Sequence, residues 1–238
     1  MWGCGRRSQR VFFTALWFAA VSLFDLASPK GAQDLISGSG MELIAAALSG
    51  DWDRVARLIL ARASPLDAQD AQGRTALLLA VDQNQVAAAR LLIAAGASVN
   101  VQASNLDTPW LLAGARGRTE IIRDMIPAGP DLTIRNRYGG NALIPACERA
   151  HLETIKLLLT TGIDVDHVNN LGWTCLLEIV LLGDGGPRHI EAARLILEAK
   201  ADPNLADKQG VTPLAHARAK GQTEVAKLIE AAGGRLRR

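Results

Sequence analysis

GRTALLLAVDQNQVAAARLLIAAGASVN, at residues 73–100, has two close counterparts further along the chain. They are DTPWLLAGARGRTEIIRDMIPAGPDLT at 107–133 and GNALIPACERAHLETIKLLLTTGIDVD at 140–166. A period of this length is typical of proteins built from stacked supersecondary units. The residues that recur every 33 positions include Thr75, Thr108, Asn141 and Thr174, and Gly96, Gly129 and Gly162.

Each copy predicts two short helices separated by a turn. A threonine or asparagine such as Thr75 precedes an apolar run, where its side chain can cap the free amide groups of a helix start. A second run holds paired aliphatic residues such as Leu91 and Leu92, and it ends at a glycine, Gly96, which suits a helix C-cap. Small residues such as Ala80 let neighbouring helices approach closely. The sequence therefore predicts an all-α solenoid of helix–turn–helix units.

Five or six copies account for residues 41–238. The first is loose and the last is polar and truncated, as expected of units that cap an array. The fifth is stretched to 38 residues by GDGGP at 183–187. We interpret this insertion as a lengthened loop, because the other ligands of a phosphate or calcium site are missing. The expected units are about 40–72, 73–105, 106–138, 139–171, 172–209 and 210–238.

The N-terminal segment differs from the rest in composition. All four phenylalanines lie in the first 24 residues, and three arginines in residues 5–10 precede the largely apolar run 11–24. This order is typical of a secretory signal peptide. As a helix the run would span roughly 21 Å, less than the ~30 Å of a bilayer core. We expect a signal peptide over residues 1–32 and a flexible joint over 33–40, with an uncleaved membrane anchor as the alternative.

The charge of the chain argues against a nucleic-acid partner. Its 26 basic and 24 acidic residues give a formal net charge of +2. Loss of residues 1–32 would remove four basic groups and one acidic group and leave −1. We therefore expect no nucleic-acid binding, and membrane contact only if the signal segment is retained.

The repeats resemble ankyrin repeats. TPWLLA (108–113) and TPLAHA (212–217) are similar to the T-P-L-H-x-A opening of that family, while GASVN (96–100) and KADPN (200–204) are similar to its G-A-D-V-N close. No copy has the full opening. The resemblance implies helix pairs joined by β-hairpin fingers and stacked into a solenoid that binds a partner protein.

The sequence contains no motif of an enzyme or a metal centre. The four histidines fall at different repeat positions and would not converge on one metal ion. We expect no cofactor and no catalytic activity. The four are His151, His167, His189 and His216.

Two side-chain relationships across repeat interfaces can be predicted if the helices stack in register. Cys147 and Cys175 are the ninth and fourth residues of neighbouring repeats, and this offset would hold their Cα atoms beyond the ~7 Å limit for a disulfide. We therefore expect two reduced thiols. Glu178 and His216 both occupy a seventh position, so we expect them to pair structurally; a catalytic dyad is the alternative, but no nucleophile stands beside them.

The resemblance also implies where a partner would dock. In ankyrin-like arrays the contact surface comprises the finger tips and the concave face of the first helices. We expect its centre at Tyr138, Trp173 and the 182–189 loop, because large aromatic residues often anchor interfaces; the alternative is that both rings only pack on the array. The expected contact residues are Arg74, Asp82, Gln83, Asn105, Asp107, Arg116, Arg137, Tyr138, Glu148, Arg149, Asn170, Leu171 and Trp173.

These observations favour an exported, monomeric, non-enzymatic scaffold of the bacterial periplasm that binds another protein. The alternative is a secreted or membrane-anchored effector that acts on host proteins or on an envelope enzyme.

Overall fold

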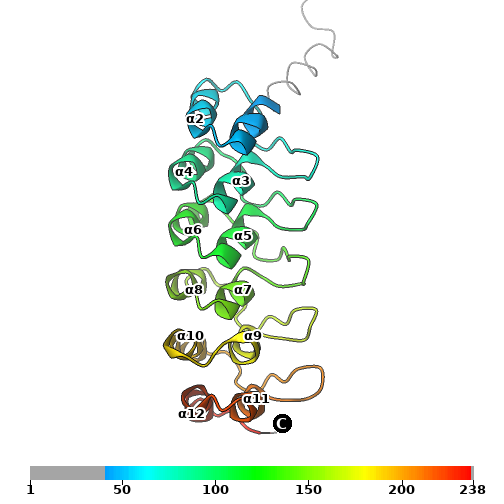
Figure 1. Ribbon diagram of the computed structural model, residues 1–238, viewed down its shortest axis with the longest axis vertical. Helices are drawn as coiled ribbons and strands as arrows, with labels where there is room; N and C mark the ends of the chain where they lie inside the picture. Colours follow the sequence, from blue (N-terminus) through cyan, green and yellow to red (C-terminus); the bar gives the residue numbers. More distant parts are fainter. Residues whose placement is uncertain (1–40, 237–238) are drawn as a thin grey trace, which may run out of the picture.

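The computed structural model describes residues 41–236 (Figure 1). The expected signal segment (1–32) and joint (33–40) lie outside these described residues. Within 41–236, no helix is both long enough and apolar enough to cross a membrane.

Six helix pairs make up the described chain. In each pair the first helix is called inner and the second outer. The inner helices are 41–49, α3 (Ala76–Asp82), α5 (Pro109–Arg116), α7 (Leu143–Glu148), α9 (Cys175–Leu182) and α11 (Pro213–Ala219). The outer helices are α2 (Trp52–Leu60), α4 (Val86–Ala94), α6 (Thr119–Met125) with the short η1 (Ile126–Ala128), α8 (Leu152–Leu159), α10 (Pro187–Glu198) and α12 (Thr223–Ala231).

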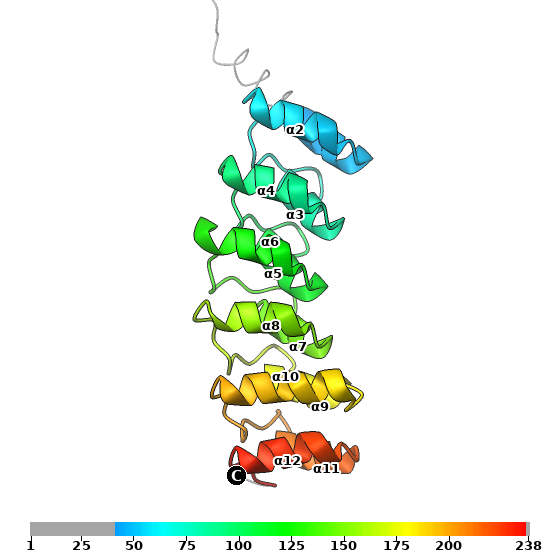
Figure 2. The ribbon, with the colours of Figure 1, turned by 90° about the vertical axis from the view of Figure 1, so that its left-hand side faces the viewer.

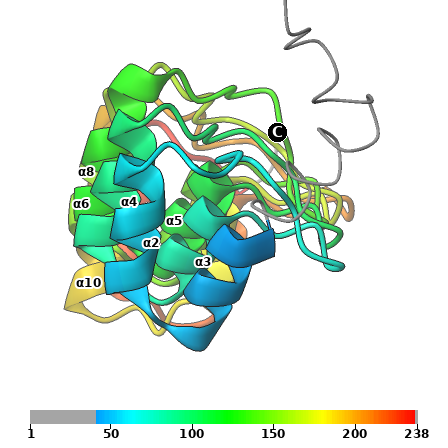
Figure 3. The same cartoon turned by 90° about the horizontal axis from the view of Figure 1, so that it is seen from above.

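The pairs stack in chain order along one axis (Figures 1 and 2). The outer helices form one column, the inner helices form a second, and the segments that lead into each inner helix project beyond it as fingers (Figure 3). Each pair thus packs mainly against its two sequence neighbours, which is the arrangement of an all-α solenoid. This confirms the predicted fold class.

Threonine caps begin four of the inner helices, as predicted. The hydroxyl of Thr75 accepts a hydrogen bond from the backbone N–H of Leu78 at 3.2 Å, and Thr108 does the same for Leu111 at 3.1 Å. In the fourth repeat Asn141 takes this place and accepts from two backbone N–H groups. These local bonds satisfy amides that a helix start leaves without partners. Thr174 and Thr212 complete the set.

The core is a continuous layer between the inner and outer helices. Large apolar side chains such as Leu77, Ile121 and Leu143 are fully buried there. The small residues predicted to permit close helix approach are also fully buried. Burial of such side chains from repeat to repeat supplies the main favourable term in the stability of the array. The small residues are Ala80, Ala113, Ala146 and Ala217.

The fingers are closed turns, whereas β-hairpins were expected. No paired strands occur between residues 41 and 236. In most fingers an aspartate or asparagine closes the turn: the Asp70 carboxylate accepts from the N–H groups of Gln72 and Arg74 at 2.9 and 2.8 Å. Side chains of this kind mimic a backbone turn, so the fingers keep a fixed shape without a strand ladder. The same role falls to Asn136, Asn169 and Asp207.

The expectation of two reduced thiols is wrong: Cys147 and Cys175 form a disulfide, and their Cα atoms lie 5.6 Å apart. The reason is the stagger of neighbouring inner helices, because the ninth residue of one repeat lies against the fourth residue of the next. The same two positions one repeat earlier hold Gly114 and Ala142. A Cβ atom at Gly114 would lie only 2.5 Å from the carbonyl oxygen of Ala142. Stacking in register was therefore the wrong premise.

The outer helices end next to a residue with a positive φ, a backbone conformation that is strained for any residue with a Cβ atom. Gly96, Gly129, Gly162 and Gly233 have positive φ there, but the fifth repeat holds Lys200 at φ 69°. Lys200→Gly should raise the free energy of unfolding by about 1 kcal/mol, because a Cβ atom is strained in this region.

The matched control is Gly162→Ala, at φ 76°, where an added Cβ meets no atom within 4 Å. It should lower the free energy of unfolding by a similar amount. Denaturant unfolding measures both, and two unchanged midpoints would contradict the argument.

Candidate functional site

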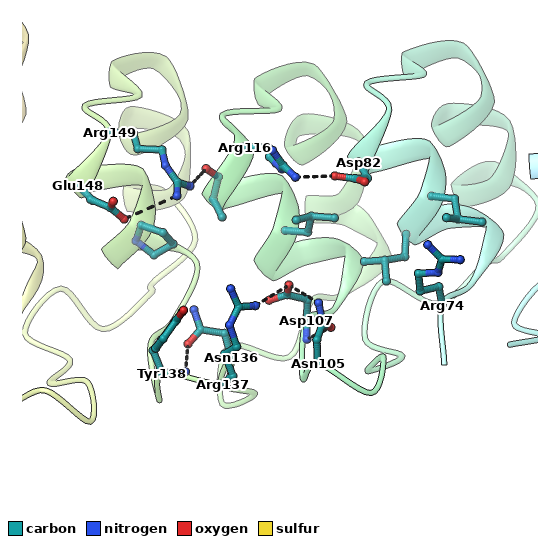
Figure 4. A pocket seen from close by; sticks show the side chains of 15 residues that line it. Arg74, Asp82, Asn105, Asp107, Arg116, Asn136, Arg137, Tyr138, Glu148 and Arg149 are labelled. Carbon is teal, nitrogen blue, oxygen red and sulfur yellow. Dashed lines mark hydrogen bonds and ion pairs between the residues drawn. The ribbon is translucent and has the colours of Figure 1, made fainter. Parts of the chain in front are cut away.

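A hollow of about 490 Å³ lies between the fingers and the inner helices of repeats two to four (Figure 4). We call it the inner groove. Its apolar floor comes from α3, α5 and α7 through Leu78, Leu79, Leu112 and Pro145. Its walls are polar: Arg74, Asn105 and Asp107 from the fingers on one side, and residues at the ends of the inner helices on the other.

The charges of the inner groove are largely paired with one another. Arg116 contacts Asp82 at 2.9 Å, and this pair joins the ends of α5 and α3. Arg137 lies 3.6 Å from Asp107 and 4.6 Å above the centre of the Tyr138 ring. The inner groove therefore has positive and negative side chains, held by these contacts, along one wall and one edge (Figure 4).

Asp107 is the most enclosed carboxylate among these pairs, with its side chain 16% exposed. Burial raises the pKa of Asp107 above its ordinary value, and the charge of Arg137 and a hydrogen bond from the Asn105 amide at 2.9 Å only partly offset this. A carboxylate held in this state gains from any additional hydrogen-bond donor. Asp107 thus marks a point of the groove that favours a donor group on a bound molecule.

Most residues that the sequence placed on the contact surface come together here. Nine of the thirteen line the inner groove: Arg74, Asp82, Asn105, Asp107, Arg116, Arg137, Tyr138, Glu148 and Arg149.

The other four lie elsewhere. Leu171 lines an adjoining hollow. Trp173, half-buried, lines neither hollow, nor do Gln83 and Asn170. The Asn170 backbone instead bonds to the neighbouring finger, its N–H donating to the carbonyl of Tyr138 at 2.8 Å.

Sequence reasoning missed the groove floor. Leu79, Leu112 and Pro145 occupy the seventh position of their repeats, and the tenth position, Asp82 or Glu148, follows three residues later. Residues three apart share one face of a helix. That spacing alone could have added the seventh position to the expected surface.

The adjoining hollow, of about 270 Å³, continues the groove from repeat four to repeat five. We call it the acidic hollow after Glu148 and Glu178, which line it together with Arg137 and Arg149. Leu182, the last residue of α9, lies at its edge. The loop that follows covers only 183–186 and is shorter than the expected 182–189, because α10 begins at Pro187.

Glu178 and His216 do not pair, contrary to expectation. Each bonds instead to the finger that leads into its repeat: the Asn169 amide donates to Glu178 Oε1 at 2.9 Å, and His216 Nε2 lies 2.7 Å from Asp207 Oδ2. No hydrogen bond or ion pair joins Glu178 to His216 in the described structure. The seventh-position side chain thus bonds to a residue nine positions earlier, in the finger that precedes its inner helix.

No metal site is evident in the described part of the chain. Residues 41–236 hold no group of three or more histidine, cysteine or acidic side chains placed to bind one ion.

Comparison with known proteins defines the class. Residues 16–103 and 110–207 match the family described as ankyrin repeats (3 copies). The chain belongs to the ankyrin repeat family. It is 49% identical over 65 residues to the ankyrin repeat protein YahD of Escherichia coli (strain K12), a match that spans 27% of this chain and only 32% of that protein.

Solved structures show the same architecture over most of the chain. An ankyrin repeat domain from Acinetobacter baumannii AYE is 47% identical, with a TM-score of 0.77 over 81% of this chain and 98% of that one. The ankyrin repeat protein EF0377 is 39% identical, with a TM-score of 0.78 over 80% and 97%. The ankyrin repeat domain of Bcl-3, a member of the IkappaB family, is 26% identical, with a TM-score of 0.71 over 82% and 86%. Ankyrin repeats are generally protein-interaction modules and typically non-enzymatic.

Proposed function

We propose that this protein is a non-enzymatic scaffold that binds a segment of a partner protein along the inner groove and the acidic hollow. The observation that carries the proposal is the continuity of the two hollows, which share Asn136, Arg137, Tyr138, Pro145, Glu148 and Arg149. Tyr138 is 53% exposed at their junction. Tyrosine and arginine are the side chains that most often anchor a protein interface.

Replacement of Tyr138 tests this function. Tyr138→Ala should weaken partner binding by about tenfold or more, as expected of an interface anchor. The partner is first captured from the native cell envelope on immobilised protein, and its affinity is then measured by calorimetry. Leu60→Ala is the matched control, because Leu60 is 75% exposed on the outer helix α2, away from both hollows. Equal affinities for the two variants and the unmodified protein would reject the proposed surface.

We further propose export to the bacterial periplasm. The basic and apolar order of residues 5–24 supports it, as does the Cys147–Cys175 disulfide, since such bonds persist in oxidising compartments. The relatives from Escherichia coli and Acinetobacter baumannii support a bacterial setting. Fractionation with N-terminal sequencing tests this: a periplasmic protein that begins after the apolar run is expected, and a cytoplasmic protein that retains it would refute export. A mature form in the medium or in the membrane would favour the effector alternative.

A further inference from the structure

The acidic hollow combines an apolar rim with a buried carboxylate. Tyr138, Leu171 and Leu182 line it, and each is about half exposed, at 53%, 50% and 51%. They are three large apolar side chains around one opening. Glu178 also lines the hollow but is only 5% exposed.

Glu178 has fewer partners than a buried carboxylate can accept. Its one hydrogen bond in the described structure comes from the Asn169 amide to Oε1. The Asn169 amide oxygen is already engaged with the N–H groups of Leu171 and Trp173, so its nitrogen must face Glu178. A carboxylate has about four acceptor positions. The second oxygen, Oε2, is therefore available to a bound molecule.

The positions of Asn169 and Glu178 are held by Asp207 and His216 at repeat six, where the two side chains are partners of each other. There Asp207 and His216 bond to each other, with an imidazole in the place of Glu178. Repeat five instead sets a carboxylate against a neutral amide. The negative charge at Glu178 is thus left without a cation at the finger position that faces it.

Neighbouring elements do not supply that cation either. On α7, Glu148 is a like charge, while Arg149 donates to the Ala115 carbonyl at 2.6 Å and contacts Glu148 at 3.9 Å. On the following repeat, Lys220 donates to the carbonyls of Val180 and Leu181.

The finger before repeat four supplies no cation to Glu178, because Arg137 lies against Tyr138 and Asp107. Burial, and then the charge of Glu148, raise the pKa of Glu178 to about 7.

We propose that the acidic hollow receives a lysine side chain of the partner protein, with its ammonium on Glu178 Oε2 and its aliphatic stem against Leu171 and Leu182. This rests on the proposed binding function. The stem of a lysine buries apolar area while its head carries the charge. A guanidinium favours a contact with both carboxylate oxygens, and one acceptor position of Oε1 is taken by Asn169. Oε2, the oxygen without a partner, therefore suits a compact ammonium group.

A displayed library of twelve-residue peptides, selected on the full-length protein at pH 8, provides the probe. The selected peptides should carry a lysine beside apolar residues. With the synthetic peptide, Glu178→Gln should weaken binding at least tenfold at pH 8, and replacement of the peptide lysine by norleucine should do the same. The two losses should not add, because both remove one contact.

The control is Glu153→Gln on the outer helix α8, whose side chain is 72% exposed and should have no effect on peptide binding. The wild-type affinity should fall as the pH is lowered from 8 to 5.5, since protonated Glu178 no longer attracts an ammonium, and that of Glu178→Gln should not.

Two further results separate the two proposals. Peptides that lose affinity with Tyr138→Ala but not with Glu178→Gln would overturn the lysine inference and leave the binding function standing. Peptides whose affinity changes with neither substitution, or a selection that returns no binder, would contradict both the binding function and the lysine inference.

Discussion

Reduction of the Cys147–Cys175 disulfide should lower the free energy of unfolding by about 3 to 4 kcal/mol. The bond joins residues 28 positions apart in sequence, and closure of a loop of this length restricts the unfolded chain by about that amount. Both cysteines are almost completely buried between α7 and α9, so the paired thiols remain packed after reduction. The loss should therefore come mainly from the unfolded state. Urea unfolding with and without a thiol reductant measures it.

The control removes both sulfur atoms. The chain has a third cysteine, Cys4, which is replaced by serine in every variant so that it cannot exchange. In this background, the double variant Cys147→Ala and Cys175→Ala should be less stable than the oxidised protein and insensitive to reductant. Identical unfolding curves for the oxidised and reduced parent would show that the two thiols are not linked.

Glu178→Gln should raise the free energy of unfolding by about 3 kcal/mol at pH 8 and change it little at pH 4. The pKa of Glu178 rises from 4.5 to about 7 on folding, chiefly through burial. Below pH 4.5 both states are protonated, and between 4.5 and 7 only the unfolded chain ionises, so stability falls as the pH rises. Above pH 7 the whole loss is present, at about 1.4 kcal/mol for each pH unit between the two pKa values.

Glutamine abolishes this dependence because it cannot ionise, and its amide oxygen still accepts from Asn169. Chemical unfolding at several pH values gives both curves. Glu153→Gln serves again as the control and should match the parent at every pH, since exposed ion pairs contribute little. Parallel curves for the parent and Glu178→Gln would mean that Glu178 titrates normally.

The parts of the fold that depend on nearby residues could be predicted from the sequence. The cap at Thr75 acts on Leu78, three residues away, and the terminal turn at Gly96 involves only its own helix. Because the sequence pattern recurs every 33 residues, the same local prediction applies to each copy of the repeat. The helix pairs therefore followed directly from the sequence pattern.

What failed depends on how one helix lies against the next. Stacking in register was assumed, and that single premise produced both the separated cysteines and the Glu178–His216 pair. Stagger between helices arises from the shapes of many packed side chains, and the 33-residue period does not report it. The floor of the inner groove was missed for a different reason: its seventh-position residues share a helix face with the tenth position, and that spacing was not used. Trp173 is a large aromatic residue of the kind that often anchors an interface, but it lies outside both hollows.

The link between α7 and α9 also changes how the array responds to a pull at its ends. A solenoid whose units touch only their neighbours can lengthen under load by releasing one repeat after another. The chain between Cys147 and Cys175 would add roughly 100 Å when fully extended, at about 3.5 Å per residue, but the bond keeps that length from the load. Stretching therefore leaves residues 147–175 as a short inextensible segment beside the proposed binding surface, and the extension comes from the repeats on either side.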